Sequence, residues 1–283
     1  MATTADHPTI AAAPDDIAGY RVVRALAAGP GAPPSYLALS AADRYVVLKP
    51  LDDDCLHRGQ LHPAVLQRLA RVRELAHPGI ANLHSVERDA GGGGGGAAYL
   101  VWEHAEGRTF DEFLAAGPTP KELWLAGREL ILTVEALHAQ GIVHGAVHGR
   151  NVIVAPTGRV RLTHVSPLLY TDPGEDEQAV LDLLAAAAAA PDDAALSEAV
   201  TAARAEPKHP LRRLSGRLAE LLEAREAPRV VPAPGDADDR RPRAGAVAGA
   251  VVTACVGLAI VYGAIRYAGA TTMPAPMTGV RAE

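Results

Sequence analysis

The sequence predicts an α+β protein with two lobes, followed by one transmembrane α-helix. Short β-like runs fill most of the first part of the chain, and apolar residues at helical spacing dominate the region after them. An uncharged apolar run then occupies 244–265. Strand-rich and helix-rich regions that follow one another along a chain are typical of the α+β class.

The composition favours a globular chain of modest stability. Of 283 residues, 48% are hydrophobic but only 4% are aromatic, and alanine supplies much of the apolar content. Alanine buries little area, so the stability per residue should be modest. The net charge of -6 argues against a general nucleic-acid binder. Cys55 and Cys255 are not expected to pair, because Cys255 lies inside the apolar run, and this fits a reducing compartment.

Residues 19–104 are expected to form the strand-rich first lobe, after a disordered N-terminus at 1–18. Apolar residues at 63–75 recur at helical spacing, and Pro63 suits the first turn of a helix. The glycine tract at 91–96 indicates a loop insertion between two strands. The expected strands of this lobe are 20–24, 36–40, 45–51, 80–86 and 99–102.

Residues 105–225 are expected to form the second, mainly helical lobe, and 226–243 a linker rich in Pro and Asp. Two short β-like runs flank a Pro-Thr-Gly turn inside this lobe. Prolines near 191 and 207 divide its last helical block. The expected elements are helices at 110–115, 119–140 and 178–225 and strands at 152–154 and 160–162.

The uncharged run predicts a membrane anchor. It is about the length that crosses a bilayer core of roughly 30 Å. Its apolar residues lie on every side of a helix, which argues against the alternative of a buried core helix. A basic excess marks the cytoplasmic side of a membrane helix, and three arginines precede this one, Arg240, Arg241 and Arg243. We therefore expect a single-pass helix at 244–267 in the cell membrane, a cytoplasmic N-terminal domain and a short extracytoplasmic tail at 268–283.

Five segments follow one another in a distinctive order: Val46-Val47-Leu48-Lys49, 75–80, 99–104, 142–144 and 158–162. Taken in order, they resemble the lysine strand, the helix end and turn, the hinge, the catalytic-loop entry and a later strand of bacterial Ser/Thr protein kinases, over residues 19–185. The resemblance implies a two-lobed kinase-like fold with a truncated C-terminal lobe. His144, Gly145 and His148 are also similar to a motif of aminoglycoside-phosphotransferase-like kinases, which remain a related possibility.

Two residues match the nucleotide-binding positions of that family. Lys49 is similar to the lysine that contacts the phosphates, and Asn151 to the asparagine that holds the second metal ion. Each has a structural alternative. Lys49 could pack only its aliphatic stem on a strand, and Asn151 could cap the turn into the next strand.

The remaining positions of the motif are degenerate. Ala146 stands where the resemblance implies the catalytic Asp, and alanine cannot accept a proton. His164 stands at the metal-binding Asp, although Mg²⁺ prefers oxygen ligands. Gln67 or Arg68 stands at the glutamate that pairs with the lysine, and neither can form that ion pair.

The loops of the family are also altered. Its phosphate loop falls near Ala28, Pro30 and Pro33, and proline has no N–H to donate to a phosphate. Asp176 is similar to the acid that opens a later helix. Only a short segment separates it from His164, so the activation segment is essentially absent.

These features lead to three hypotheses. The first is a membrane-anchored pseudokinase that binds a protein partner at the inner membrane face and needs no ATP, Mg²⁺ or other metal. Similar actinobacterial kinase-like domains occur attached to the lipid II flippase, so the resemblance implies a role in cell-envelope regulation. The second is an atypical protein kinase or phosphotransferase with residual ATP binding, in which Asp172, Glu175 or Asp176 replaces the missing acids. The third is a sensor that binds nucleotide without turnover. A zinc site at His144, His148 and His164 is not favoured, because no Cys or carboxylate accompanies them.

Overall fold

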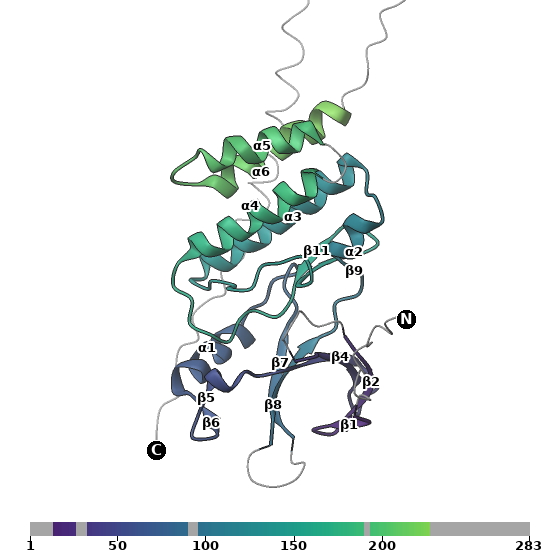
Figure 1. Cartoon of the computed structure of the whole chain (residues 1–283), viewed down its shortest axis with the longest axis vertical. Helices are drawn as coiled ribbons and strands as arrows, with labels where there is room; N and C mark the ends of the chain where they lie inside the picture. Colours follow the sequence, from purple (N-terminus) through teal and green to yellow (C-terminus); the bar gives the residue numbers. More distant parts are fainter. Residues whose placement is uncertain (1–13, 27–32, 90–95, 190–192, 227–283) are drawn as a thin grey trace, which may run out of the picture. The chain divides into compact units, whose positions relative to one another are not determined.

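The computed structural model describes residues 14–26, 33–89, 96–189 and 193–226. Its first part is a curled antiparallel sheet of six strands in the order β1-β2-β3-β4-β8-β7 (Figure 1). A curled antiparallel sheet of this kind is consistent with the N-terminal lobe of a kinase-like fold. The strands are β1 (Asp16–Ile17), β2 (Tyr20–Ala25), β3 (Tyr36–Leu39), β4 (Tyr45–Pro50), β7 (Leu83–Arg88) and β8 (Ala98–Glu103).

Both faces of this sheet are apolar, because alternate residues of β4 enter different clusters. Val46 and Leu48 pack in a small cluster with Ile17. Val47 enters the main core together with Trp102 of β8. This alternation follows the two-residue period of a strand, and it fixes which side chains of β4 and β8 share a face.

The sheet begins earlier than the boundary at residue 18 that the sequence suggested. Asp16 and Ile17 pair with Arg21 and Tyr20 of β2. Ile17 is 1% exposed in the smaller cluster. A strand of two residues has no periodic pattern, so only its burial against neighbouring strands defines it.

Helix α1 (Pro63–Arg73) lies beside the sheet and begins at Pro63, as the sequence predicted. The His62 side chain accepts a hydrogen bond from the Ala64 N–H at 3.2 Å and so caps the first turn. The buried side of α1 carries Arg68 among three apolar residues. The short elements before it are the 3₁₀ turn η1 (Asp53–Cys55) and the hairpin β5 (Leu56–His57) and β6 (Gln60–Leu61).

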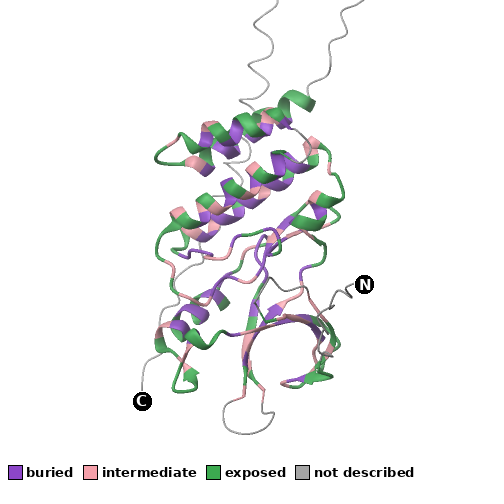
Figure 2. Ribbon diagram, in the orientation of Figure 1, coloured by how far each residue is buried: buried purple, intermediate pink, exposed green. Residues whose placement is uncertain are grey.

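The second part is mainly helical. Helix α3 begins with a capping box between Thr119 and Glu122 and packs against α4 and α6. Buried residues lie on the sides where these helices face one another (Figure 2). The elements are β9 (Arg108–Thr109), α2 (Phe110–Ala115), α3 (Pro120–Ala139), β10 (Val152–Val154), β11 (Val160–Leu162), α4 (Pro173–Ala189), α5 (Ala194–Arg204) and α6 (Pro210–Glu226).

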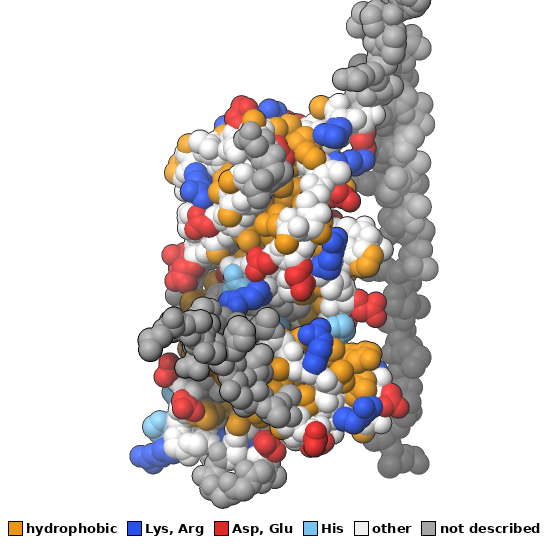
Figure 3. Space-filling model, turned by 45° about the vertical axis from the view of Figure 1, so that its right-hand side comes forward, with side chains coloured by type: hydrophobic (Ala, Val, Ile, Leu, Met, Phe, Trp, Pro, Cys, Tyr) orange, Lys and Arg blue, Asp and Glu red, His pale blue; other side chains and the backbone are white. Residues whose placement is uncertain are grey.

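The two parts belong to one compact unit, Met1–Pro228. A parallel bridge between Ile80 and Leu162 joins the turn after α1 to β11. The face drawn in Figure 3 carries acidic and basic side chains interspersed, so its charge is mixed. Helix 110–115 and strands 152–154 and 160–162 are confirmed, and the block 178–225 is divided into α4, α5 and α6.

The predicted membrane helix at 244–267 and the tail at 268–283 lie outside the described residues, as does the linker apart from residue 226. Among the helices of the described part, none combines the length and the hydropathy that a membrane crossing requires. The anchor therefore stays a prediction.

Candidate functional site

The residues singled out in the sequence meet between the two parts. Lys49 lies on β4, and Ala146 and Asn151 lie on the loop between α3 and β10. His164 follows β11, and Arg68 comes from α1.

The loop after α3 is held by the carboxylate of Asp176, in the first turn of α4. This carboxylate accepts hydrogen bonds from the backbone N–H groups of His144 at 2.6 Å and Gly145 at 2.8 Å. The His138 ring is its third partner, at 2.9 Å. Burial pushes the pKa of Asp176 upward, but these hydrogen bonds outweigh burial and keep the pKa below its ordinary value. Asp176 thus lies in the first turn of a helix, as predicted. Its side chain is 1% exposed and accepts hydrogen bonds from the loop, so it does not replace the missing metal-binding acid.

His144 is a structural residue of this loop. Its ring Nδ1 accepts from the Ala146 N–H, and its Nε2 donates to the carbonyl oxygen of Thr163. Burial lowers the pKa of His144 to about 4, although the nearby Asp176 opposes the shift. Because protein groups occupy both nitrogens of the neutral ring, His144 is not available to bind zinc.

Asn151 joins the two degenerate positions directly. Its amide nitrogen donates to the carbonyl oxygen of Ala146 at 2.9 Å. Its amide oxygen lies 3.2 Å from Nδ1 of His164. Because the nitrogen is committed to Ala146, the oxygen is the acceptor and His164 Nδ1 carries the proton. The Asn151 side chain therefore forms a bridge across the site.

His164 is held neutral in this bridge. Burial, followed by the charge of Lys49, lowers the pKa of His164 to about 3. Its Nε2 atom is buried and has no hydrogen-bond partner among the described residues. The ring packs edge-on against Trp102, with 5.7 Å between ring centroids. His164 adopts a positive φ of 62°, a conformation that is uncommon for residues other than glycine.

Lys49 lies opposite Leu100 in the sheet. Burial lowers the pKa of Lys49, Asp52 opposes this shift and Arg150 adds to it. No hydrogen bond or ion pair joins Lys49 to another residue in the described part of the chain. The structure thus places the partly buried cation of Lys49 beside His164. The resemblance implies a carboxylate at the position of His164.

Arg68 fills the place of the expected glutamate, whereas Gln67 is exposed. Arg68 cannot form an ion pair with Lys49, because both are cations, and its guanidinium group instead spans two backbone carbonyl groups. Its Nη2 donates to Val143 O at 2.5 Å and its Nε to Ser166 O at 2.7 Å. This clamp ties α1 to the loop after α3 and to the segment after β11. Such a role could have been suspected from an arginine on the apolar side of a helix, but its targets lie far away in the sequence.

A second bridge, which the sequence analysis missed, links β8 to β11. Arg161 forms a two-pronged ion pair with Glu103, with both N–O distances at 2.7 Å. Arg161 also donates to the carbonyl oxygen of Ile80, and Glu103 accepts from Asn82. The hydrogen bond from Arg161 is the main cause that lowers the pKa of Glu103 to about 2.

The donor set does not fit a Mg²⁺–nucleotide complex. Ala146 offers no side-chain oxygen. His164 offers at most a ring nitrogen, which is a poor ligand for Mg²⁺. The Asn151 oxygen is already paired with His164. Of the described positions that match the kinase motif, Lys49 keeps a side chain suited to phosphate. The positions near Ala28 and Pro30 lie outside the described residues.

The chain is similar to Ser/Thr protein kinases, although no family model matches it. It is 26% identical to Ser/Thr-protein kinase PrkC of Bacillus subtilis over 51% of this chain and 22% of the relative. It is 32% identical to PknA of Mycobacterium tuberculosis over 31% of this chain and 21% of the relative. For a probable Ser/Thr-protein kinase of Clostridium perfringens, the figures are 25% identity, 43% of this chain and 17% of the relative. The chain thus spans only about a fifth of these relatives, and the matches support a kinase-like domain.

The Glu103–Arg161 pair predicts a defined dependence of stability on pH. Folding lowers the pKa of Glu103 from 4.5 to about 2. Its contribution to the free energy of unfolding is therefore complete above about pH 4.5 and is lost as the pH falls through about 2. Glu103→Gln should lower the melting temperature at pH 6 and should flatten its fall between pH 5 and pH 2. Melting curves of the full chain across this range measure both effects.

Glu226→Gln is the matched control, because Glu226 pairs with Lys121 at an exposed site. Its melting temperature should follow that of the unchanged chain across the range. Parallel pH profiles for Glu103→Gln and the unchanged chain would contradict the role given to the pair.

Proposed function

We propose that this chain is a pseudokinase, a kinase-like domain that acts by binding a protein partner and does not transfer phosphate. One observation carries the proposal. The positions of the catalytic base and the metal ligand hold Ala146 and His164, and Asn151 joins them by hydrogen bonds at 2.9 and 3.2 Å.

The chemistry of phosphoryl transfer explains why this bridge matters. Transfer depends on positioning and on neutralising the charge of the phosphates, for which kinases use acids that hold metal ions. A general base alone contributes about 10²- to 10⁴-fold to a rate. Ala146 removes that contribution, and a neutral His164 beside Lys49 replaces the negative charge that would attract a cation. Arg68 adds a further positive charge where the resemblance implies an acid.

A binding role is supported by what the molecule keeps. Arg68 and the Glu103–Arg161 pair still tie the two parts to one another, and Asp176 fixes the loop after α3 within the second part. We propose that this ordered surface is presented at the inner face of the cell membrane by a helix at 244–267, where tethering would raise the effective concentration of a weak partner. The resemblance to actinobacterial kinase-like domains favours cell-envelope regulation as the process, and Gly245 and Gly249 suit close packing with a partner helix.

Residual nucleotide binding is the second candidate, and Lys49 favours it. A partly buried ammonium without a partner among the described residues is a suitable contact for a phosphate. Binding of this kind would need no metal, so it is compatible with a nucleotide sensor and does not require transfer.

The first prediction of this proposal concerns transfer. The purified full chain, incubated with labelled ATP and either Mg²⁺ or Mn²⁺, should show no incorporation above background. Protein kinases turn over at about 1–100 s⁻¹, and the loss of the base alone would lower this by about 10²- to 10⁴-fold. Lys49→Ala serves as the control, because any labelling by a contaminating kinase should persist in it. Metal-dependent labelling that Lys49→Ala abolishes would contradict the pseudokinase and favour the atypical enzyme.

The second prediction concerns the anchor. The full chain should remain in the membrane fraction after washes that release peripheral proteins, because transfer of an apolar helix to water is unfavourable. Deletion of 244–267 should move the chain to the wash. Deletion of 268–283 is the matched control and should leave it in the membrane. Release of the full chain by high salt or alkaline washing would exclude the predicted span.

A further inference from the structure

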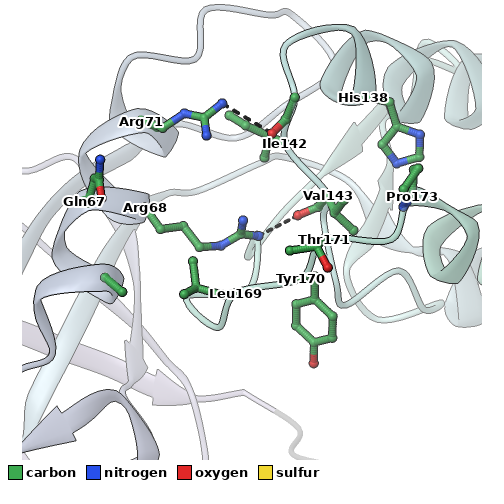
Figure 4. Close-up of a pocket in the computed structure, with 12 residues that line it drawn as sticks. Gln67, Arg68, Arg71, His138, Ile142, Val143, Leu169, Tyr170, Thr171 and Pro173 are labelled. Atoms are coloured by element: carbon green, nitrogen blue, oxygen red, sulfur yellow. Dashed lines mark hydrogen bonds between the residues drawn. The ribbon is translucent and has the colours of Figure 1, made fainter.

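A cavity of about 470 Å³ lies between α1 and the segments around residues 141–143 and 169–173 (Figure 4). The cavity is open on one side, and its edge includes Leu169, which is 61% exposed. Its lining comes from three parts of the chain that meet only in the folded domain. Neither the nucleotide-binding positions nor the predicted anchor accounts for it.

Two arginines give this cavity its charge. Arg68 and Arg71 both leave α1 and extend toward the segment that follows α3, as Figure 4 shows. Among the described residues that line the cavity, none is an aspartate or a glutamate. The nearby carboxylate of Asp176 keeps its charge, which favours the charged form of Arg68, but it is buried and its oxygens already accept three hydrogen bonds. With two arginines and no acid in its lining, the cavity is basic, in contrast to the mixed surface drawn in Figure 3.

The guanidinium groups still have donors to offer. Arg68 uses Nε and Nη2 in its clamp and makes no bond through Nη1 with a described residue. Nη1 of Arg68 is not fully buried, although the residue as a whole is only 8% exposed. Arg71 uses only Nη2, toward the carbonyl oxygens of Gln140 and Gly141. The clamp holds one arginine rigid, and the exposed second arginine is free to adjust.

A volume of about 470 Å³ is enough for a phosphorylated or acidic side chain with some of its neighbours, and it also lies within the range of small-molecule pockets. Tyr170 belongs to the lining, and its ring packs directly against Gly145, where a side chain would collide with it. Leu169 offers an apolar contact at the edge for the residues beside the anion.

We propose that this cavity binds an anionic side chain of a protein partner, either a phosphorylated serine or threonine or a carboxylate. Guanidinium groups form charge-assisted, two-pronged hydrogen bonds to both kinds of anion. A phosphate carries more charge and more acceptor oxygens than a carboxylate, so it should bind more tightly. The inference rests on the proposed function in one respect, namely that the partner is a protein.

Three peptides test the proposal. They share a short Gly-Ala sequence with phosphothreonine, glutamate or threonine at the centre, and each is titrated into the full chain by fluorescence anisotropy without ATP. The phosphothreonine peptide should bind, the glutamate peptide should bind more weakly, and the threonine peptide should not bind. Binding by the glutamate peptide as tight as by the phosphothreonine peptide would identify a carboxylate as a sufficient source of the anion.

Matched variants on α1 locate the site. Arg71→Gln should weaken binding of the phosphothreonine peptide by about fivefold or more, because it removes a charged donor from the cavity. Arg73→Gln removes the same charge from the same helix outside the cavity lining and should leave the affinity unchanged. Arg68→Gln is the less decisive variant, since the loss of its clamp can unfold the domain.

Equal binding of the threonine peptide, equal effects of the two variants, or no binding of any peptide at millimolar concentration would overturn the proposal. Phosphate transfer from ATP would instead contradict the proposed function and leave the peptide result standing. The two failures are therefore distinguishable.

Discussion

Hydrogen bonds from His144, Gly145 and His138 converge on the buried carboxylate of Asp176, and the arrangement of the site depends on them. They fix the loop after α3 at the point where it approaches β11. Ala146 and Asn151 take their places from this loop, and Asn151 then positions His164. A buried acceptor that loses its donors is expected to cost about 1–3 kcal/mol, or more when it is charged. The same contact thus stabilises the domain and orients the residues that decide its chemistry.

The charges around this loop differ from those that phosphoryl transfer requires. Arg68 reaches Val143 and Ser166 and supplies a structural tie where an acid is expected. His164 remains neutral because it is buried near Lys49, so it neither neutralises the lysine nor attracts a metal ion. The site therefore preserves the connection between the two parts while losing the acidic groups. This arrangement, together with the open basic cavity, supports the proposed role in recognition.

Much of this could be predicted from local patterns, and the remainder could not because it depends on distant contacts. The apolar spacing and the prolines located α1, α3 and the divided helical block, and motif order located Lys49, Ala146, Asn151 and His164. The sequence did not reveal that Asn151 bonds to His164, because the two meet only after β10 and β11 pair. Nor did it reveal the Glu103–Arg161 pair, whose partners lie on separate sheets. Strand β1 was missed because two residues show no period, and the membrane helix at 244–267 lies outside the described residues.

Among its described residues, the site lacks the oxygen ligands that a metal–nucleotide complex requires. The decisive measurement is calorimetric titration of ATP into the full chain, with Mg²⁺ and again with EDTA. Any binding should depend on Lys49 and should change by less than about twofold when Mg²⁺ is added, because neither Ala146 nor His164 is a suitable ligand for Mg²⁺. Binding that Mg²⁺ tightens about tenfold or more, and that Asn151→Ala returns to the level measured in EDTA, would contradict the account.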